Sequence, residues 1–163
     1  IAIDSRGPVF FTQGRNGLNG RHFRIYKFRT MRPARDPSTF VQATANDPRT
    51  TRFGAVLRRT GLDELPQLIN VIKGDMSLVG PRPHVPEMDE ALSHAVNGYW
   101  NRYLVRPGVT GLAQVTGYRG PVNSLNSATG RLNQDVAYIR NWSVWLDLKI
   151  LFATPLSLLR PAR

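Results

Sequence analysis

The first thirty positions intersperse aromatic and aliphatic residues with polar and basic ones, a pattern that favours extended chain. Residues 8–13 and 22–31 carry this pattern, and residues 16–20 between them supply the asparagine and glycine that tight turns need. The sequence therefore predicts a β-hairpin. Residues 32–52 are polar, contain proline and show no period, so we expect a long surface loop there.

The hydrophobic positions beyond residue 52 indicate helices joined by short, stiff connections. Helices are expected over four segments: 53–60, 63–73, from Pro86 to about Trp100, and 129–141. The two remaining segments, 77–83 and 106–121, are punctuated by glycine and proline and are expected to be loops. The fold class is therefore α+β and helix-dominated, with a small N-terminal hairpin, and residues 1–163 form a single domain.

The C-terminal segment 143–159 is largely apolar but is broken by Asp147, Lys149 and Pro155. It is too short and too interrupted to span a bilayer, and it suits a helix at a membrane interface or in the core. The chain opens without methionine in the middle of a pattern. We therefore expect a fragment of a longer protein, with a membrane anchor missing upstream.

The charge balance is strongly basic, with 22 Lys and Arg against 11 Asp and Glu and a net charge of +11. Only Lys27, Lys73 and Lys149 are lysine, and arginine favours paired hydrogen bonds to phosphate or carboxylate oxygens. An anionic partner is expected, on a nucleotide, a nucleic acid or a lipid headgroup. There are no cysteines, which excludes disulfides and cysteine-based zinc sites.

Asp63 and Glu64 are the first candidates for chemistry. Asp63 is expected at the N-cap of the second helix, because this places Pro66 in the first turn, where proline is tolerated. A carboxylate there can be a simple cap. A helix N-terminus also attracts phosphate, and Arg58 lies about one turn upstream. In that setting one carboxylate could attack phosphorus while the other holds a divalent cation.

Three further positions have both a structural and a functional interpretation. Arg82 lies between two prolines, either as a solvated side chain on a rigid turn or as an arginine held ready for phosphate. Arg106 begins an Arg-Pro-Gly step that suits an ordinary turn or a hinged flap. Asp135 has a structural hydrogen bond or a surface position as its default role.

Four strings of residues are highly specific: KFRTM at 27–31, LRRTGLDELPQL at 57–68, GDMSLVGPRP at 74–83 and RPGVTGLAQ at 106–114. Together with Asp135, Tyr138 and the Asn-Trp-Ser step at 141–143, they resemble the bacterial sugar transferase family, the monotopic phosphoglycosyl transferases. The resemblance covers nearly the whole chain, and the order and spacing of the strings both match.

The resemblance implies a covalent reaction in two steps. Asp63 attacks the sugar-bearing phosphate of a UDP-sugar, UMP leaves, and polyprenyl phosphate, usually undecaprenyl phosphate, then takes the phosphosugar. Mg²⁺ lies with Glu64. Arg58 and Arg82 match positions that hold phosphates, Arg106 lies in a flap over the nucleotide, and Asp135 matches an acidic position in the substrate site.

The resemblance also implies a setting at the membrane. Family members carry a re-entrant membrane helix just upstream of the segment that matches residues 7–10, and we expect that helix to be missing from this chain. The resemblance also implies helices that lie along the membrane surface. The expected location is the cytoplasmic face of the bacterial inner membrane, where the enzyme starts exopolysaccharide or capsule synthesis. Residues 117–120 resemble glucose-type members, a homo-oligomer is possible, and Gly61 stands where the family often has serine.

Two alternatives remain on the residues alone. A basic nucleic-acid-binding module would use arginine interleaved with aromatic residues at 21–29, but it leaves the Asp63-Glu64 pair unexplained. A non-catalytic scaffold at the membrane surface would use the Trp-rich C-terminal segment, but it needs neither the carboxylates nor Arg82. The interpretation as an enzyme accounts for all of these features, and under it we expect no nucleic-acid partner.

Overall fold

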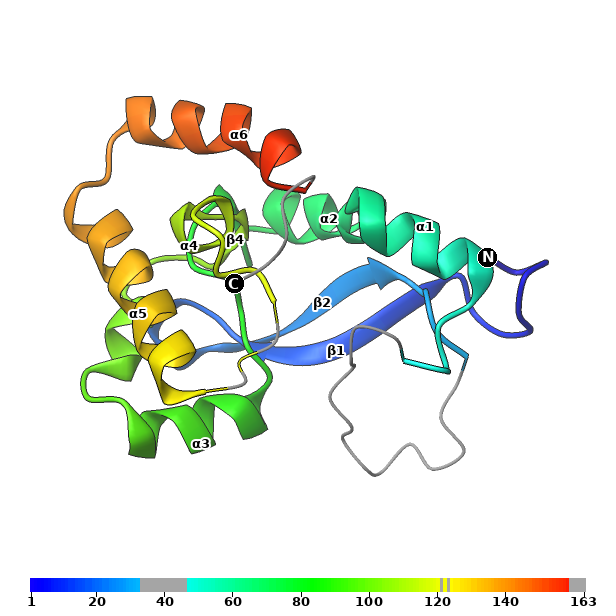
Figure 1. Ribbon diagram of the computed structural model, residues 1–163, viewed down its shortest axis with the longest axis horizontal. Helices are drawn as coiled ribbons and strands as arrows, with labels where there is room; N and C mark the ends of the chain where they lie inside the picture. Colours follow the sequence, from blue (N-terminus) through cyan, green and yellow to red (C-terminus); the bar gives the residue numbers. More distant parts are fainter. Residues whose placement is uncertain (33–46, 121, 123, 159–163) are drawn as a thin grey trace.

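A long antiparallel hairpin lies through the middle of the molecule (Figure 1). The computed structural model describes residues 1–32, 47–120, 122 and 124–158 of the chain. Its two long strands are β1 (Phe10–Asn16) and β2 (His22–Phe28), joined by the 3-10 turn η1 (Leu18–Gly20). Phe10 pairs with Phe28 at the open end, and Asn16 pairs with His22 beside the turn. The expected hairpin is confirmed, although β1 begins two residues later than the pattern indicated and extends further toward the turn.

Most of the expected surface loop, residues 33–46, lies outside the described residues. Its two ends are close together, because Met31 and Thr50 form an isolated antiparallel bridge. Thr51 then caps helix α1 (Arg52–Thr60), its hydroxyl accepting a hydrogen bond from the Gly54 amide at 3.0 Å. The expected helix is confirmed to within one residue at its start.

The expected N-cap role of Asp63 is wrong. Gly61 ends α1 with φ of 71°, and the chain then makes the 3-10 turn η2 (Leu62–Glu64), which contains Asp63. Helix α2 (Gln67–Ile72) begins only after Pro66, which occupies its N-cap. Proline is compatible with either arrangement, and the sequence gives no direct sign of the tight turn that the left-handed glycine starts.

Two segments that were expected to be loops contain short strands, so that expectation is wrong in part. Strand β3 (Ser77–Val79) pairs in parallel with β4 (Gly108–Thr110), with Val79 opposite Thr110. Glycine is required here because the two backbones lie very close together. A Cβ atom on Gly108 would lie 2.1 Å from the Gly80 nitrogen. The glycines that suggested loops therefore mark a close approach of two strands.

The remaining helices differ from expectation mainly at their ends. Helix α3 (Pro86–Ala95) stops before Trp100, because the chain becomes extended at Val96 with φ of −128°. Gly98, with φ of 73°, then precedes the 3-10 turn η3 (Tyr99–Tyr103), which contains Trp100. Helix α5 (Leu125–Arg140) is capped by Ser124 and starts earlier than residue 129. Helix α6 (Val144–Leu158) agrees with the expected apolar segment to within one residue at each end. The short helix α4 (Leu112–Val115) lies in segment 106–121, which was expected to be a loop, so that expectation is wrong there too.

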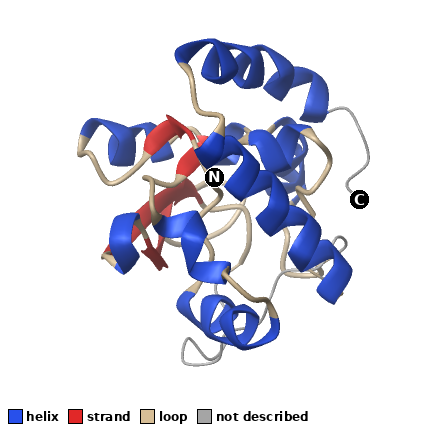
Figure 2. Cartoon of the chain, turned by 90° about the vertical axis from the view of Figure 1, so that its left-hand side faces the viewer, coloured by secondary structure: helices blue, strands red, loops and turns tan. Residues whose placement is uncertain are grey.

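Helices surround the strands on several sides, which confirms the helix-dominated α+β class (Figure 2). One core cluster joins Val79 of β3, Tyr138 of α5 and Ile150 of α6, and a second joins Val96, Ala128 and Leu132. Among the described residues, no helix combines the length and the hydrophobicity needed to cross a membrane.

Candidate active site

Glu64 lies between two positively charged side chains from different parts of the chain. Lys27 of β2 places Nζ 2.7 Å from Glu64 Oε1. Arg82, in the segment after β3, donates from Nη1 to Glu64 Oε2 at 2.9 Å and from Nη2 to Oε1. This paired geometry uses the planar fork of the guanidinium. Arg82 is therefore not a freely solvated side chain, and the partner that the structure gives it is a carboxylate.

The hairpin and α2 are fixed to each other beside this site. Asn70 of α2 is fully buried, and its side chain accepts a hydrogen bond from the Tyr26 amide at 3.0 Å and donates to the Arg24 carbonyl at 2.7 Å. The amide side chain thereby continues the hydrogen-bonding edge of β2. This contact holds η2, with Glu64, next to the part of β2 that carries Lys27.

The two cations determine the charge state of Glu64. Burial alone would raise the pKa of its carboxyl, but the charges and hydrogen bonds of Arg82 and Lys27 outweigh burial and hold that pKa well below its usual range. Glu64 is therefore a carboxylate at every physiological pH. Burial and the nearby Arg82 lower the pKa of Lys27, an effect that Glu64 partly offsets.

Asp63 has the opposite environment. Its side chain is 9% exposed, and burial together with the negative charge of Glu64 raises the pKa of its carboxyl. Lys27, Arg82 and Arg58 offset part of this rise. Within the described part of the chain, no residue donates a hydrogen bond to this carboxylate. A poorly solvated carboxylate without donors is a more reactive nucleophile than one held by hydrogen bonds.

The structure brings four of the expected site residues together: Arg58, Asp63, Glu64 and Arg82. Arg58 lies in the last turn of α1, where its Nη1 donates to the Thr50 hydroxyl at 3.3 Å and its charge acts on Asp63. Lys27 was not singled out from the sequence, although it begins the first of the specific strings. A contact across 37 positions gives no local signal.

Arg106 and Asp135 lie apart from this group. The Arg106 side chain is exposed just before β4, and its backbone carbonyl lies against Gly80. Asp135 is 2% exposed on α5, where it forms a buried ion pair with Arg102 at 2.9 Å. Asp135 is therefore linked to the site through Arg102. Like Lys27, Arg102 was not singled out from the sequence.

The carboxylates allow a simple test of whether a divalent cation fits. Among the described residues, no group of three or more His, Cys, Asp or Glu side chains could hold a metal ion. Glu64 is ionised and lies beside a second carboxylate, although Lys27 and Arg82 already occupy most of its lone pairs. These residues do not form a cage made of protein ligands alone. An ion such as Mg²⁺, which commonly takes one or two carboxylates and completes its shell with water and substrate phosphates, would need only the remaining carboxylate oxygen positions of this pair.

A desolvated carboxylate, an ionised neighbour and three surrounding cations are the groups that chemistry on phosphate groups commonly uses. The chain belongs to the bacterial sugar transferase family, whose family model matches residues 1–161. This membership confirms the resemblance on which the sequence interpretation relied.

Several relatives are similar over nearly all of the chain. A UDP-glucose:undecaprenyl-phosphate glucose-1-phosphate transferase of Xanthomonas campestris pv. campestris is 49% identical over 98% of the chain and 33% of its own length. An Escherichia coli K12 protein of the same name is 47% identical over 94% of the chain and 33% of its own length. A UDP-N-acetylgalactosamine-undecaprenyl-phosphate N-acetylgalactosaminephosphotransferase of Aeromonas hydrophila is 42% identical over 94% of the chain and 36% of its own length. The chain thus spans about a third of the length of these relatives.

Proposed function

We propose that this chain is the catalytic domain of a phosphoglycosyl transferase that moves a hexose-1-phosphate from a UDP-sugar to undecaprenyl phosphate and releases UMP. The observation that carries this proposal is the adjacent carboxylate pair with opposite environments. Asp63 is desolvated and receives no hydrogen bond from any residue that the structure describes, while Glu64 is ionised between Lys27 and Arg82. The names of the relatives that are 47–49% identical support the same reaction.

The proposed chemistry has two displacements at one phosphorus atom. A carboxylate oxygen of Asp63 forms a bond to the sugar-bearing phosphorus while the anhydride bond to UMP breaks, and the bridging oxygen leaves with UMP. An oxygen of polyprenyl phosphate then attacks the same phosphorus. The aspartyl oxygen–phosphorus bond breaks, and Asp63 returns to its carboxylate form. The lipid product carries the sugar on a diphosphate.

The basic residues of the site serve charge neutralisation, which dominates catalysis of phosphoryl transfer. Arg82 and Arg58 are proposed to bind phosphate oxygens of the UDP-sugar, and Lys27 lies close enough to Glu64 to share that role. Glu64 would hold Mg²⁺, which when bound supplies positive charge to the diphosphate. Arg106 is proposed to face the nucleotide from the start of β4.

Glucose is the proposed sugar. The Xanthomonas and Escherichia relatives, at 49% and 47% identity, are named for UDP-glucose, whereas the Aeromonas relative, at 42%, is named for UDP-N-acetylgalactosamine. Residues 117–120, which resemble glucose-type members, agree with this choice. The proposed role is the first membrane step of exopolysaccharide or capsule synthesis, at the cytoplasmic face of the inner membrane.

Release of UMP tests the proposed function. The protein is incubated with undecaprenyl phosphate and a panel of UDP-sugars, and UDP-glucose is expected to give the fastest release. Asp63→Asn removes the nucleophile with little change of shape, so UMP release and the phosphosugar adduct seen by intact mass should both disappear. Asp4→Asn, at an exposed position, is the matched control and should behave as the wild type. Near-normal turnover of Asp63→Asn would overturn the assignment.

A further inference from the structure

A buried guanidinium lies directly behind Arg82. Arg102 of η3 is 1% exposed, and its Nη2 donates to the backbone carbonyl of Arg82 at 2.7 Å. Arg82 is thus held at both ends, because its side chain binds Glu64 while its backbone is bound to Arg102. The hydrogen bond from Arg102 fixes the position of the Arg82 backbone, and that position limits where the Arg82 guanidinium can lie.

Arg102 is itself held firmly. Its Nε and Nη2 both donate to Asp135 Oδ2, at 3.2 and 2.9 Å, and its Nη1 donates to His84 Nδ1 at 2.6 Å and to the Tyr99 hydroxyl at 3.0 Å. With the bond to Arg82, every N–H of this guanidinium has a partner. A side chain with all its donors used is fixed in one orientation, and none of its donors is free for a substrate.

The charge state of His84 supports this arrangement. Burial, followed by the charges of Arg102, Arg131 and Arg82, holds the pKa of His84 well below its usual range. The ring is therefore neutral and has one acceptor nitrogen. The nearer guanidinium is that of Arg102, 2.6 Å from Nδ1, whereas Arg131 lies 3.2 Å from Nε2, so we assign Nδ1 as the acceptor. Asp135 and Arg102 consequently form the main ion pair behind the segment that carries Arg82.

We propose that Arg102, held by Asp135, is a positioning residue that fixes the Arg82 backbone and so aims the Arg82 guanidinium at the carboxylate pair and at substrate phosphate. The proposal rests on the proposed function. It also gives Asp135 a definite role: Asp135 orients Arg102 and contacts no substrate. The contacts thus form a series: Asp135 of α5 binds Arg102 of η3, Arg102 binds the Arg82 backbone, and the Arg82 side chain binds Glu64.

A kinetic double-mutant cycle separates positioning from general stability. An ammonium cannot reach Asp135, His84 and the Arg82 carbonyl together, so Arg102→Lys should lower kcat/KM by about tenfold to a hundredfold, mainly through kcat. In an Arg82→Lys background the same change should cost less than about twofold, because the group that it positions is already gone. Losses that multiply in the double variant would overturn the proposal.

Two further variants control for folding. Tyr103→Phe removes a 2.6 Å hydrogen bond to Asp89 from the same buried cluster but keeps the ring and does not touch Arg82. It should lower the melting temperature without lowering kcat/KM below that temperature. Asp135→Asn keeps the shape of the side chain and one oxygen acceptor. It replaces Arg102→Lys in the cycle if the latter does not fold.

A spectroscopic measurement makes the result independent of the reaction. The Nη–H signals of a guanidinium are resolved by NMR while the group is held rigid, and those of Arg82 can be assigned with Arg82→Lys. They should broaden in Arg102→Lys and persist in Tyr103→Phe. Unchanged Arg82 signals in Arg102→Lys would overturn the positioning role. If the wild type releases no UMP, the proposed function fails, and these signals still decide the role of Arg102.

Discussion

Asp63 and Glu64 are neighbours in the chain, yet their surroundings shift their pKa values in opposite directions. Burial and the charge of Glu64 raise the pKa of Asp63, whereas Arg82 and Lys27 hold that of Glu64 well below its usual range despite burial. Glu64, which is paired with both cations, neutralises their charge. Asp63 keeps a carboxylate that the fold stabilises poorly, as a reactive group requires.

Asp63→Asn should stabilise the protein at neutral pH. The raised pKa means that ionising Asp63 is harder in the folded state than in the unfolded chain, so the cost appears as the pH rises through that pKa. An amide removes this cost, and we expect a gain of roughly 1 kcal/mol in the free energy of unfolding. The measurement is urea unfolding at pH 7 and near pH 4. The gain should shrink at the lower pH, and a loss at pH 7 would contradict the argument.

Glu64→Gln should have the opposite effect, because it leaves Lys27 and Arg82 without their partner in a largely buried site. Breaking such an arrangement costs about 3 kcal/mol. The lowered pKa of Glu64 means that its stabilisation is fully present above the usual range of a glutamate and is lost as the pH falls toward the lowered value. Equal stability of this variant and the wild type at pH 7 would show that the two cations find other partners.

Arg82→Lys tests the paired geometry at the same scale. Lysine keeps the charge but cannot donate to both oxygens of Glu64 at once, as the arginine does. We expect kcat/KM for UMP release to fall about tenfold or more. Arg140→Lys, at an exposed position on α5, is the matched control and should leave the rate unchanged. Wild-type activity of the Arg82 variant would mean that it supplies only general positive charge.

At the scale of elements, the sequence located the hairpin from two extended segments around an asparagine- and glycine-rich turn, and the long helices from hydrophobic positions that repeat over several turns. It failed where a single backbone contact decides the structure. The pairing of β3 with β4 and the turn that holds Asp63 depend on close approach at Gly108 and a left-handed Gly61. Such contacts arise from tertiary structure, and a glycine in the sequence does not say which neighbour it makes room for.

Gly54 places α1 over the segment that follows β2. A Cβ atom at this position would lie 2.1 Å from the backbone oxygen of Thr30, which also accepts a hydrogen bond from the Thr51 amide. Gly54→Ala must therefore move α1, which carries Arg58, and we expect a loss of about 3 kcal/mol together with lower activity. The control is Gly14→Ala, where nothing lies within 4 Å. Equal melting temperatures for the two variants would contradict the contact.

At the scale of the whole molecule, the site is assembled from segments that are far apart in the chain. Asp63, Glu64 and Arg82 could be chosen from the sequence because each lies in a specific string or beside rigid neighbours. Lys27 and Arg102 could not, since their contacts cross 37 and 33 positions and depend on how β2 and η3 pack. Sequence reasoning thus selected the two carboxylates and Arg82 of the candidate site, and the structure added the residues that contact them.

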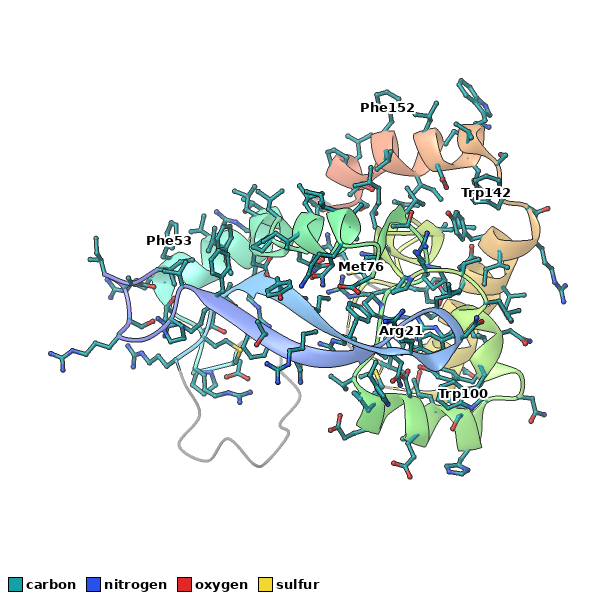
Figure 3. The ribbon with its side chains drawn as sticks, turned by 180° about the vertical axis from the view of Figure 1, so that it is seen from behind. Arg21, Phe53, Met76, Trp100, Trp142 and Phe152 are labelled. Carbon is teal, nitrogen blue, oxygen red and sulfur yellow. The ribbon has the colours of Figure 1, made fainter. Side chains whose placement is uncertain are left out.

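The molecule also exposes an unusual amount of apolar surface on α1, α2 and α6. Leu158 at the end of α6 lies within 3.3 Å of where a side chain on Gly61 would begin, so the junction of α1 and α2 meets α6. In Figure 3 the labelled Phe53 and Phe152 both lie along the upper edge, on α1 and α6. An apolar groove of about 360 Å³ follows the outer face of α6. Large apolar side chains that are at least 39% exposed line this surface, namely Phe53, Val56, Leu65, Leu68, Ile69, Ile72, Trp145, Leu148, Phe152 and Leu156.

This apolar surface, together with the net charge of +11, leads us to expect weak, reversible binding to anionic membranes. Basic side chains near anionic lipid contribute roughly 1 kcal/mol each, so binding should weaken as salt rises. Co-sedimentation with phosphatidylglycerol vesicles at low and high salt measures this, with phosphatidylcholine vesicles for comparison.

The contribution of α6 can be separated from that of charge by two tryptophan variants. Trp145 is 66% exposed on the outer face of α6, whereas Trp100 is 51% exposed on η3 and lies at the opposite edge from Phe152 in Figure 3. Tryptophan inserts favourably at the level of lipid headgroups, so Trp145→Ser should release more protein from anionic vesicles than Trp100→Ser does. If the wild type ignores anionic vesicles at low salt, the membrane prediction fails. If it binds but both variants bind equally well, charge alone draws the domain to lipid and α6 has no part in the contact.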